Sequence, residues 1–217
     1  MRSPRAPSSP VSDERPRRPA GERLPPAERR AKLLRAFRDE ALAAGAIAGV
    51  GIRAVVERAG CTAPVLYRLF GDRAGLVQAA VRSTHTSMLA RLEAAARPGG
   101  GSCAERIRRL GLAYIARGAG PDDEFEALVN VACGNEPELA AIVRDVFGRF
   151  EQLLAALVRE GIAAGEFAAA TDPEYVAWRL IDLGLFRNQA HLMRLERPDA
   201  LRYEARALDS LLAEIAA

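Results

Sequence analysis

The sequence predicts an all-α protein, and three observations support this prediction. About one residue in five is alanine, whereas valine, isoleucine and threonine together account for only about one in eight. Alanine favours helices, and β-branched side chains favour strands. Apolar residues recur at helical spacing in several segments, and no segment alternates with a period of two. The apolar fraction of 49% is sufficient for a folded core.

Residues 1–25 are expected to form a disordered basic arm. Seven of the 13 prolines lie in the first 26 residues, together with several serines and arginines. Such a segment cannot bury enough apolar area to offset the entropy lost on ordering. It lacks the apolar stretch of a secretory signal, and no apolar run in the chain approaches the roughly 20 residues that span a bilayer. The sequence therefore predicts a cytoplasmic protein with no membrane partner.

Four helices are expected in the first half of the folded chain. Pro26 suits the first turn of a helix and Gly45 suits its end, with an apolar stripe between them. Two short helices at 51–58 and 63–69 follow, and then a long helix at 73–96. A proline and three glycines stop this long helix.

Five further helices are expected, at 103–118, 122–133, 137–164, 172–194 and 199–215. The helix at 172–194 is apolar on nearly all sides, which is typical of a helix buried on two sides. One side would face the subunit core, and the other a second copy, with Gly184 allowing close approach. The helices at 172–194 and 199–215 would then form a homodimer interface, which Leu183→Arg should disrupt. The alternative is a central core helix in a monomer.

The charge distribution suggests that only the first half of the chain meets a polyanion. Residues 1–97 carry 18 arginines and lysines against 9 acidic residues, whereas residues 98–217 carry 13 against 19. A chance distribution over solvated faces is the alternative.

The chain has three widely spaced cysteines, an odd number, and none of them forms a CxxC pair. This usage fits a reducing compartment and not a disulfide framework.

Two short helices joined by residues 59–61 in this basic half resemble a helix-turn-helix. The turn needs a residue that tolerates positive φ, which Gly60 supplies. The second helix needs a capped start that can point into the major groove, and Thr62 is the expected cap.

Residues 52–76, IRAVVERAGCTAPVLYRLFGDRAGL, extend this motif and resemble the DNA-binding region of TetR-family transcriptional regulators. The shared pattern comprises Ala59, Gly60, Cys61, Thr62, Val65, Leu66, Tyr67, Phe70, Arg73 and Leu76. The chain departs from the pattern at Gly51, which offers no capping side chain, and at Leu69, where histidine is common. Cys61 replaces the usual valine, and Pro64 replaces a frequent glycine.

The resemblance implies a set of DNA-binding residues on and around the second short helix. Thr62 and Tyr67 would contact phosphates, Ala63, Val65 and Arg68 would face the groove, and Arg73 and Arg53 would contact further phosphates. It also implies a three-helix DNA-binding domain at 26–72, an effector-binding and dimerisation domain at 73–217, and a bacterial repressor that a small molecule releases from a near-palindromic operator.

A small-molecule pocket is expected in the second domain, lined by large or polar side chains on helices that surround its centre. The expected lining is Met88, Tyr114, Phe125, Asn130, Phe147, Phe150 and Trp178. Few charges fall on these faces, so an apolar or aromatic effector is expected. Because aromatic residues at helical spacing also build plain cores, each of these residues has that alternative.

No catalytic, cofactor or metal motif is recognisable in the chain, which argues against an enzyme. GxSxG, P-loop, GxGxxG and HExxH patterns are absent from the sequence, and the two histidines, His85 and His191, stand alone. Two alternatives to an effector-controlled regulator remain. One is an all-helical small-molecule-binding protein or enzyme with a vestigial DNA-binding motif, and the other is a DNA-binding protein without a ligand.

Overall fold

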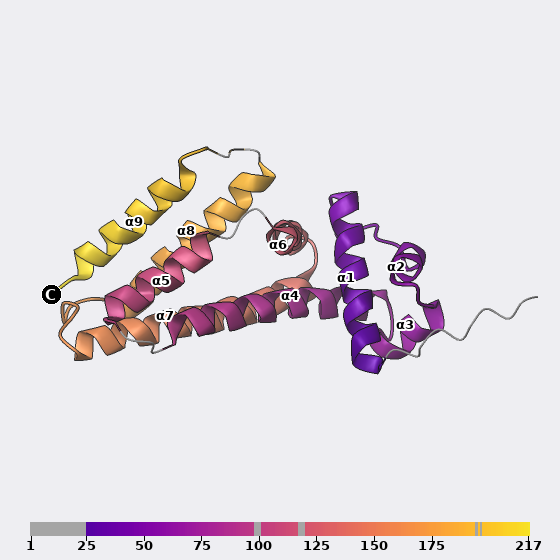
Figure 1. The fold of residues 1–217 in the computed structure, drawn as a ribbon, viewed down its shortest axis with the longest axis horizontal. Helices are drawn as coiled ribbons and strands as arrows, with labels where there is room; N and C mark the ends of the chain where they lie inside the picture. Colours follow the sequence, from indigo (N-terminus) through magenta and orange to yellow (C-terminus); the bar gives the residue numbers. More distant parts are fainter. Residues whose placement is uncertain (1–24, 98–100, 117–119, 194, 196) are drawn as a thin grey trace, which may run out of the picture.

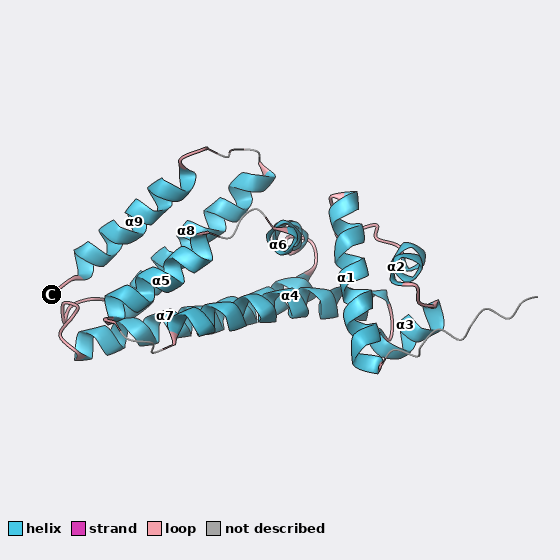
Figure 2. Cartoon of the chain, viewed as in Figure 1, coloured by secondary structure: helices cyan, strands magenta, loops and turns pink. Residues whose placement is uncertain are grey.

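The computed structural model describes residues 25–97, 101–116, 120–193, 195 and 197–217. Over these residues the chain forms α-helices, and its only strand-like pairing is an isolated antiparallel bridge between Phe167 and Ala216 (Figure 2). This confirms the all-α prediction. The expected arm at 1–25 lies, apart from Pro25, outside the described residues.

The helices follow the expected order and start close to the expected positions. They are α1 (Pro26–Ala44), α2 (Ile52–Ala59), α3 (Ala63–Phe70), α4 (Arg73–Ala96), α5 (Cys103–Ile115), α6 (Pro121–Ala132), α7 (Pro137–Ala163), α8 (Pro173–Leu192) and α9 (Ala200–Ile215). Helices α1, α2 and α3 form one end of the molecule, and α5, α8 and α9 form the other (Figure 1). The long helices α4 and α7 lie side by side between them. None of the described helices is long and apolar enough to cross a membrane.

Local sequence fixes where several helices begin and end. Gly45 adopts a φ of 65° after α1, in the left-handed region that glycine tolerates. The Asp72 carboxylate accepts a hydrogen bond of 2.7 Å from the Gly75 N–H at the start of α4. Ser102 and Glu105 form a capping box at α5, in which each side chain accepts the N–H of the other residue.

The first hydrophobic core joins the N-terminal helices to α6 and α7. It contains buried residues of α1, α2, α3 and the first half of α4, together with Phe125, Val129, Leu139 and Ile142. The Phe125 ring meets that of Phe37 edge to face, with centroids 6.2 Å apart. The N-terminal helices therefore rest on residues far beyond position 72, and a domain boundary at that position stays a prediction.

Helix α4 belongs to both cores of the molecule. Its first half contributes Leu76, Val77, Ala80 and Val81 to the first core, and its second half contributes Met88, Leu89, Leu92 and Ala96 to the second. The second core is completed by residues of α5, α7, α8 and α9. A displacement of α4 in one core therefore reaches the other through a continuous helix.

Gly184 of α8 packs inside the subunit, which corrects the expectation that it faces a partner. A β-carbon built on Gly184 would lie 2.1 Å from Cε1 of Tyr114. The Tyr114 ring therefore lies directly on the backbone of α8, where only glycine leaves room. The same ring meets Phe150 with centroids 4.9 Å apart.

Gly184→Ala should lower the free energy of unfolding by about 1–3 kcal/mol, because the added methyl group forces Tyr114 out of its packed position. Urea denaturation of the full chain measures this change. Gly148→Ala is the matched control, since a β-carbon at Gly148 in α7 meets nothing within 4 Å. Helix propensity predicts that this control stabilises the protein by about 0.5–1 kcal/mol. Equal effects of the two substitutions would contradict the packing described.

Candidate DNA-binding interface

Helices α2 and α3 form a helix-turn-helix whose turn depends on Gly60. This residue has a φ of 58°, as the sequence predicts, and its N–H donates to the Glu57 carbonyl at 3.1 Å. Val55 of α2 and Leu66 of α3 are fully buried beneath the turn. The inner faces of both helices are thus fixed by packing, and the outer face of α3 is left to solvent.

Five of the predicted DNA-binding residues lie on or directly before α3 and are at least partly exposed. Thr62, Tyr67 and Arg68 are exposed, and Ala63 and Val65 are half-buried beside them. The Tyr67 side chain is 48% exposed, so its hydroxyl is accessible rather than packed. Arg68 makes no ion pair with any residue that the structure describes. The helix therefore offers hydroxyl, methyl and guanidinium groups on one surface.

Thr62 occupies the N-cap position of α3, but its hydroxyl makes no capping hydrogen bond, contrary to the prediction. A capping oxygen normally accepts the N–H of the second or third helical residue. Here the second residue is Pro64, which has no N–H, and the Val65 N–H donates to the Thr62 carbonyl at 3.0 Å. The Thr62 hydroxyl is therefore exposed and available to an external acceptor.

Arg53 extends the accessible basic surface to α2. Its side chain is 91% exposed, and its Nε donates to Glu57 one turn later at 2.8 Å. Such exposed pairs contribute little free energy and exchange readily with other partners. Gly51 begins α2 without a side-chain cap, as the sequence predicts.

Arg73 differs from these residues because its guanidinium is bound to the backbone of the chain. It is half-buried at the first residue of α4, where its Nε donates to the Val50 carbonyl and its Nη2 to the Ile47 carbonyl, each at 3.0 Å. Two of its nitrogens thus face the chain itself. The phosphate contact by Arg73 stays a prediction. Its two hydrogen bonds to backbone carbonyls also indicate a structural role.

Arg30 of α1 also contacts the helix-turn-helix, although the sequence did not predict it. Its guanidinium lies 4.7 Å from the centroid of the Phe70 ring, and its Nη1 donates to the Leu69 carbonyl at 3.4 Å. Arg30 therefore braces the C-terminal end of α3. No local sequence pattern predicts a contact between Arg30 and Leu69, which are 39 positions apart. Phe70 is half-buried, and Arg30 covers one face of its ring.

Arg68→Gln and Arg53→Gln should affect DNA recognition differently. If Arg68 reaches a base edge, its loss changes the preferred base at one position by about 1–3 kcal/mol. The loss of Arg53, as a phosphate contact, should instead weaken binding uniformly and lower the salt slope by about one for each subunit that binds. Comparing the sequences that each variant selects from a randomised duplex pool separates the two effects. Unchanged preference and affinity in both variants would remove these residues from the interface.

Four of the residues predicted to line an effector pocket meet in the second core. Met88, Tyr114 and Phe150 are buried there, and Phe147 packs against them half-buried. They come from α4, α5 and α7, which surround a common centre. Their presence in one cluster is compatible with a pocket wall and equally with a plain core.

The other three predicted residues lie elsewhere. Phe125 is fully buried in the first core against Phe37, because the start of α6 packs on α1. Trp178 is 54% exposed on the outer face of α8, so it does not line the interior. Asn130 of α6 is half-buried, and its Nδ2 has no hydrogen-bond partner among the described residues.

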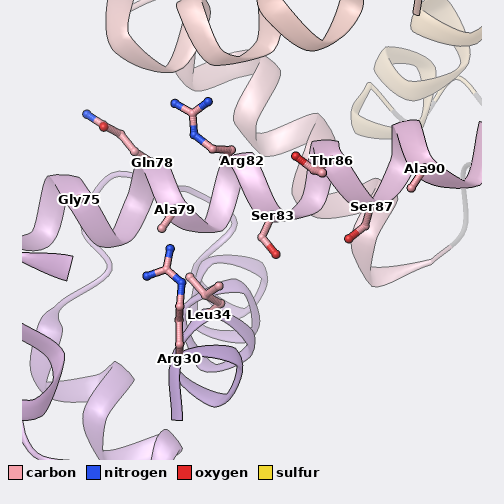
Figure 3. A pocket seen from close by; sticks show the side chains of 10 residues that line it. All are labelled: Arg30, Leu34, Gly75, Gln78, Ala79, Arg82, Ser83, Thr86, Ser87 and Ala90. Atoms are coloured by element: carbon pink, nitrogen blue, oxygen red, sulfur yellow. The ribbon is translucent and has the colours of Figure 1, made fainter. Parts of the chain in front are cut away.

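A groove of about 550 Å³ runs along α1 and α4 (Figure 3). Arg30 and Leu34 approach it from α1, and small or polar side chains such as Ser83 line it from α4. None of the seven predicted effector residues lines this groove. Within the described part of the chain, no three histidine, cysteine or acidic side chains are grouped as they would be to hold a metal ion.

Comparison with known families and structures assigns both halves of the chain. Residues 39–80 match the family of bacterial regulatory proteins called the tetR family, and residues 132–208 match the tetracyclin repressor-like C-terminal domain. No curated protein sequence matches the chain closely enough to count as a relative.

Solved structures share the fold over nearly the whole chain. A TetR transcription regulator from Haloarcula marismortui has a TM-score of 0.77 at 12% identity, covering 88% of this chain and all of its own. A TetR-family regulator from Cytophaga hutchinsonii has a TM-score of 0.72 at 17% identity, covering 90% of this chain and 98% of its own. A structure from Rhodococcus sp. assigned to the same family is 23% identical, with a TM-score of 0.70 and coverage of 86% and 99%. The helix-turn-helix, the helical bundle behind it and both family matches show that this chain belongs to the TetR family of transcriptional regulators, which are DNA-binding proteins rather than enzymes.

Proposed function

We propose that the protein is a homodimeric repressor that binds a near-palindromic operator in the bacterial cytoplasm and is released from it by a small molecule. The observation that carries this proposal is the outer face of α3, where accessible polar and basic side chains stand on a helix-turn-helix. A buried or acidic face at this position would not fit DNA.

The proposed contacts follow from the chemistry of that face. The hydroxyls of Thr62 and Tyr67 donate to phosphate oxygens and set the position of α3 on the duplex. Arg68 presents a planar guanidinium to a base edge, while the methyl groups of Ala63 and Val65 can meet a thymine methyl. Arg53 adds a phosphate contact from α2. Affinity should therefore fall with salt, because Arg53 displaces counterions at one phosphate for each subunit.

The proposed dimer interface is the outer face of α8 together with α9. Large apolar or aromatic side chains there are 44–66% exposed in the single chain, namely Tyr175, Trp178, Phe186, Leu201 and Tyr203. A patch of this kind on a folded subunit marks a protein interface. An Arg187–Glu204 ion pair of 2.9 Å joins α8 to α9, so the two helices present one surface. A second copy related by a two-fold axis would cover this surface.

Leu183 is not the position that tests this interface. It is half-buried and packs against the core of its own subunit, so Leu183→Arg would disturb the fold as well as any dimer. Phe186, three residues further along α8, is 66% exposed and points away from that core. The informative substitution is therefore at Phe186.

We place the effector in the second core, between α4, α5 and α7, with Met88, Tyr114, Phe147 and Phe150 as its apolar surroundings. An apolar or aromatic compound fits these groups. Asn130, Phe125 and Trp178 take no part in this proposed site, because they lie outside the second core.

The proposed release mechanism uses α4. The effector favours one position of the second half of α4, and the DNA-binding helices follow because the first half of α4 lies in their core. A dimer whose two α3 helices are misplaced binds the operator less tightly. In this scheme residues 26–72 form the DNA-binding domain and residues 73–217 the effector and dimerisation domain.

Selection from a randomised duplex pool with the full-length chain tests the DNA-binding proposal. We expect enrichment of an inverted repeat whose half-sites lie about 34–36 Å apart, one helical turn, or a multiple of this. The selected duplex should bind more tightly than a scrambled duplex of the same composition. A folded protein that enriches no sequence would overturn the proposal and favour a helical small-molecule-binding protein with a vestigial motif.

Coupling between effector and DNA should be reciprocal. A screen of apolar and aromatic compounds by thermal shift supplies candidate ligands, and each is then titrated against the complex with the selected duplex. A true effector lowers duplex affinity, and the duplex lowers affinity for the compound by the same factor. A compound that binds tightly but leaves duplex affinity unchanged would contradict the proposed release.

A further inference from the structure

Arg73 connects the start of α4 to the segment that precedes α2. Its side chain is half-buried, and its Nε and Nη2 donate to the carbonyls of Val50 and Ile47, each at 3.0 Å. A guanidinium can hold two acceptors at once because its donors are fixed in a plane. The contact spans 23 and 26 residues of sequence, so it joins parts of the fold that the chain does not link directly.

The segment between α1 and α2 is held by buried side chains and by its backbone contacts to Arg73. Ile47 and Val50 insert their side chains into the first core and are 2% and 4% exposed. Gly51, the N-cap of α2, offers no capping side chain, and α2 itself packs against α1. The bonds that Arg73 makes to the two carbonyls therefore add to this packing a direct connection between the start of α4 and the segment before α2.

Helix α4 makes this connection relevant to regulation. Arg73 is its first residue, and the helix continues through the first core into the second. A shift of α4 reaches α3 through the short connection at residues 71–72. Arg73 provides a second connection, to the start of α2 on the other side of the helix-turn-helix.

We infer that Arg73 is a positioning residue that ties α4 to the segment before α2, so that the two helices of the helix-turn-helix move with α4 as one unit, and that it does not act as a phosphate contact. This inference rests on the proposed function, because its consequence is measured as DNA binding. It predicts that the geometry of Arg73, and not its charge, is what operator binding requires.

Arg73→Lys and Arg73→Gln separate geometry from charge. Lysine keeps the charge but lacks the planar arrangement of donors that meets both carbonyls in arginine, and glutamine loses both properties. If Arg73 positions α2, both variants weaken binding to the selected duplex by a similar factor, about tenfold, because charge-assisted hydrogen bonds are lost in each. The dependence of affinity on salt then keeps the wild-type slope.

The opposite pattern would overturn the inference. A phosphate contact predicts that Arg73→Lys binds nearly as the wild type does and that Arg73→Gln lowers the salt slope by about one for each subunit of the dimer. Arg53→Lys and Arg53→Gln are the matched controls, since Arg53 is exposed and should show that phosphate pattern. Circular dichroism and thermal unfolding of each variant establish that the folded chain is being compared.

One measurement on the wild-type side chain keeps the inference testable if a variant fails to fold. The Nε–H of Arg73 should give a protected ¹⁵N resonance in the free protein, because it donates to the Val50 carbonyl, and DNA should leave this resonance unchanged. A resonance that appears only on DNA binding would overturn the inference. If wild type selects no duplex, the proposed function fails, and the free-protein resonance still decides the role of Arg73.

Discussion

Phe186→Arg is expected to convert the dimer to monomers and to abolish operator binding. Phe186 is 66% exposed in the single chain and lies on the surface proposed to meet a second copy. Its replacement would place two unpaired guanidinium groups in an apolar interface, at a cost of about 3–5 kcal/mol, or more than a hundredfold in the dimer Kd. A monomer engages one half-site only, so it also loses the gain from two linked binding events.

Sedimentation velocity at micromolar concentration measures the first effect, and titration of the selected duplex the second. Val131→Arg is the matched control, because Val131 is also an exposed apolar residue, at 61%, but it lies on α6 and not on the proposed surface of α8 and α9. The control should stay dimeric and bind the duplex. A Phe186→Arg variant that sediments as a dimer would show that the subunits meet elsewhere.

Phe125→Ala is expected to lower the free energy of unfolding by about 3–5 kcal/mol, because it removes a large, fully buried ring without refilling its space. The ring lies between the N-terminal helices and the rest of the molecule, edge to face with Phe37. Its loss should also weaken duplex binding, since α1 loses its support on α6. Next to it the Arg38 side chain forms an ion pair with Asp122, which alone would hold α1 only weakly.

Urea denaturation and duplex titration of the same preparation measure both effects. Phe147→Ala is the control, because Phe147 is half-buried and its loss should cost less. If Phe125→Ala lowers the free energy of unfolding no more than Phe147→Ala does, the Phe125 ring borders an open space, such as the predicted effector pocket. The ring would then not be packed between two parts of the molecule.

The fold was predictable because its signals are local. Prolines in first turns and glycines at helix ends mark the boundaries of α1, α2 and α3, and the apolar stripes of α4 and α7 have helical spacing. The helix-turn-helix likewise occupies one short stretch, in which Gly60 and Leu66 have the conformation and burial that their residue types suggest.

The contacts that could not be predicted from the sequence join residues far apart in the chain. Nothing near Gly184 shows that the ring of Tyr114, 70 residues earlier, lies on it. Trp178 has the residue type of a pocket wall, but the register of α8 turns it outward. Arg73 matches a DNA-binding pattern, yet its partners are backbone carbonyls more than 20 residues away, which no sequence pattern records.

Hydroxyl-radical footprinting of the selected duplex, combined with the mass of the complex, tests the central claim most directly. The claim is that two copies of the chain, joined through α8 and α9, place two α3 helices on one operator. It predicts a complex with an even number of chains and backbone protection in two patterns related by a two-fold axis, which Phe186→Arg abolishes. One chain per duplex, or a single asymmetric footprint that survives Phe186→Arg, would contradict it.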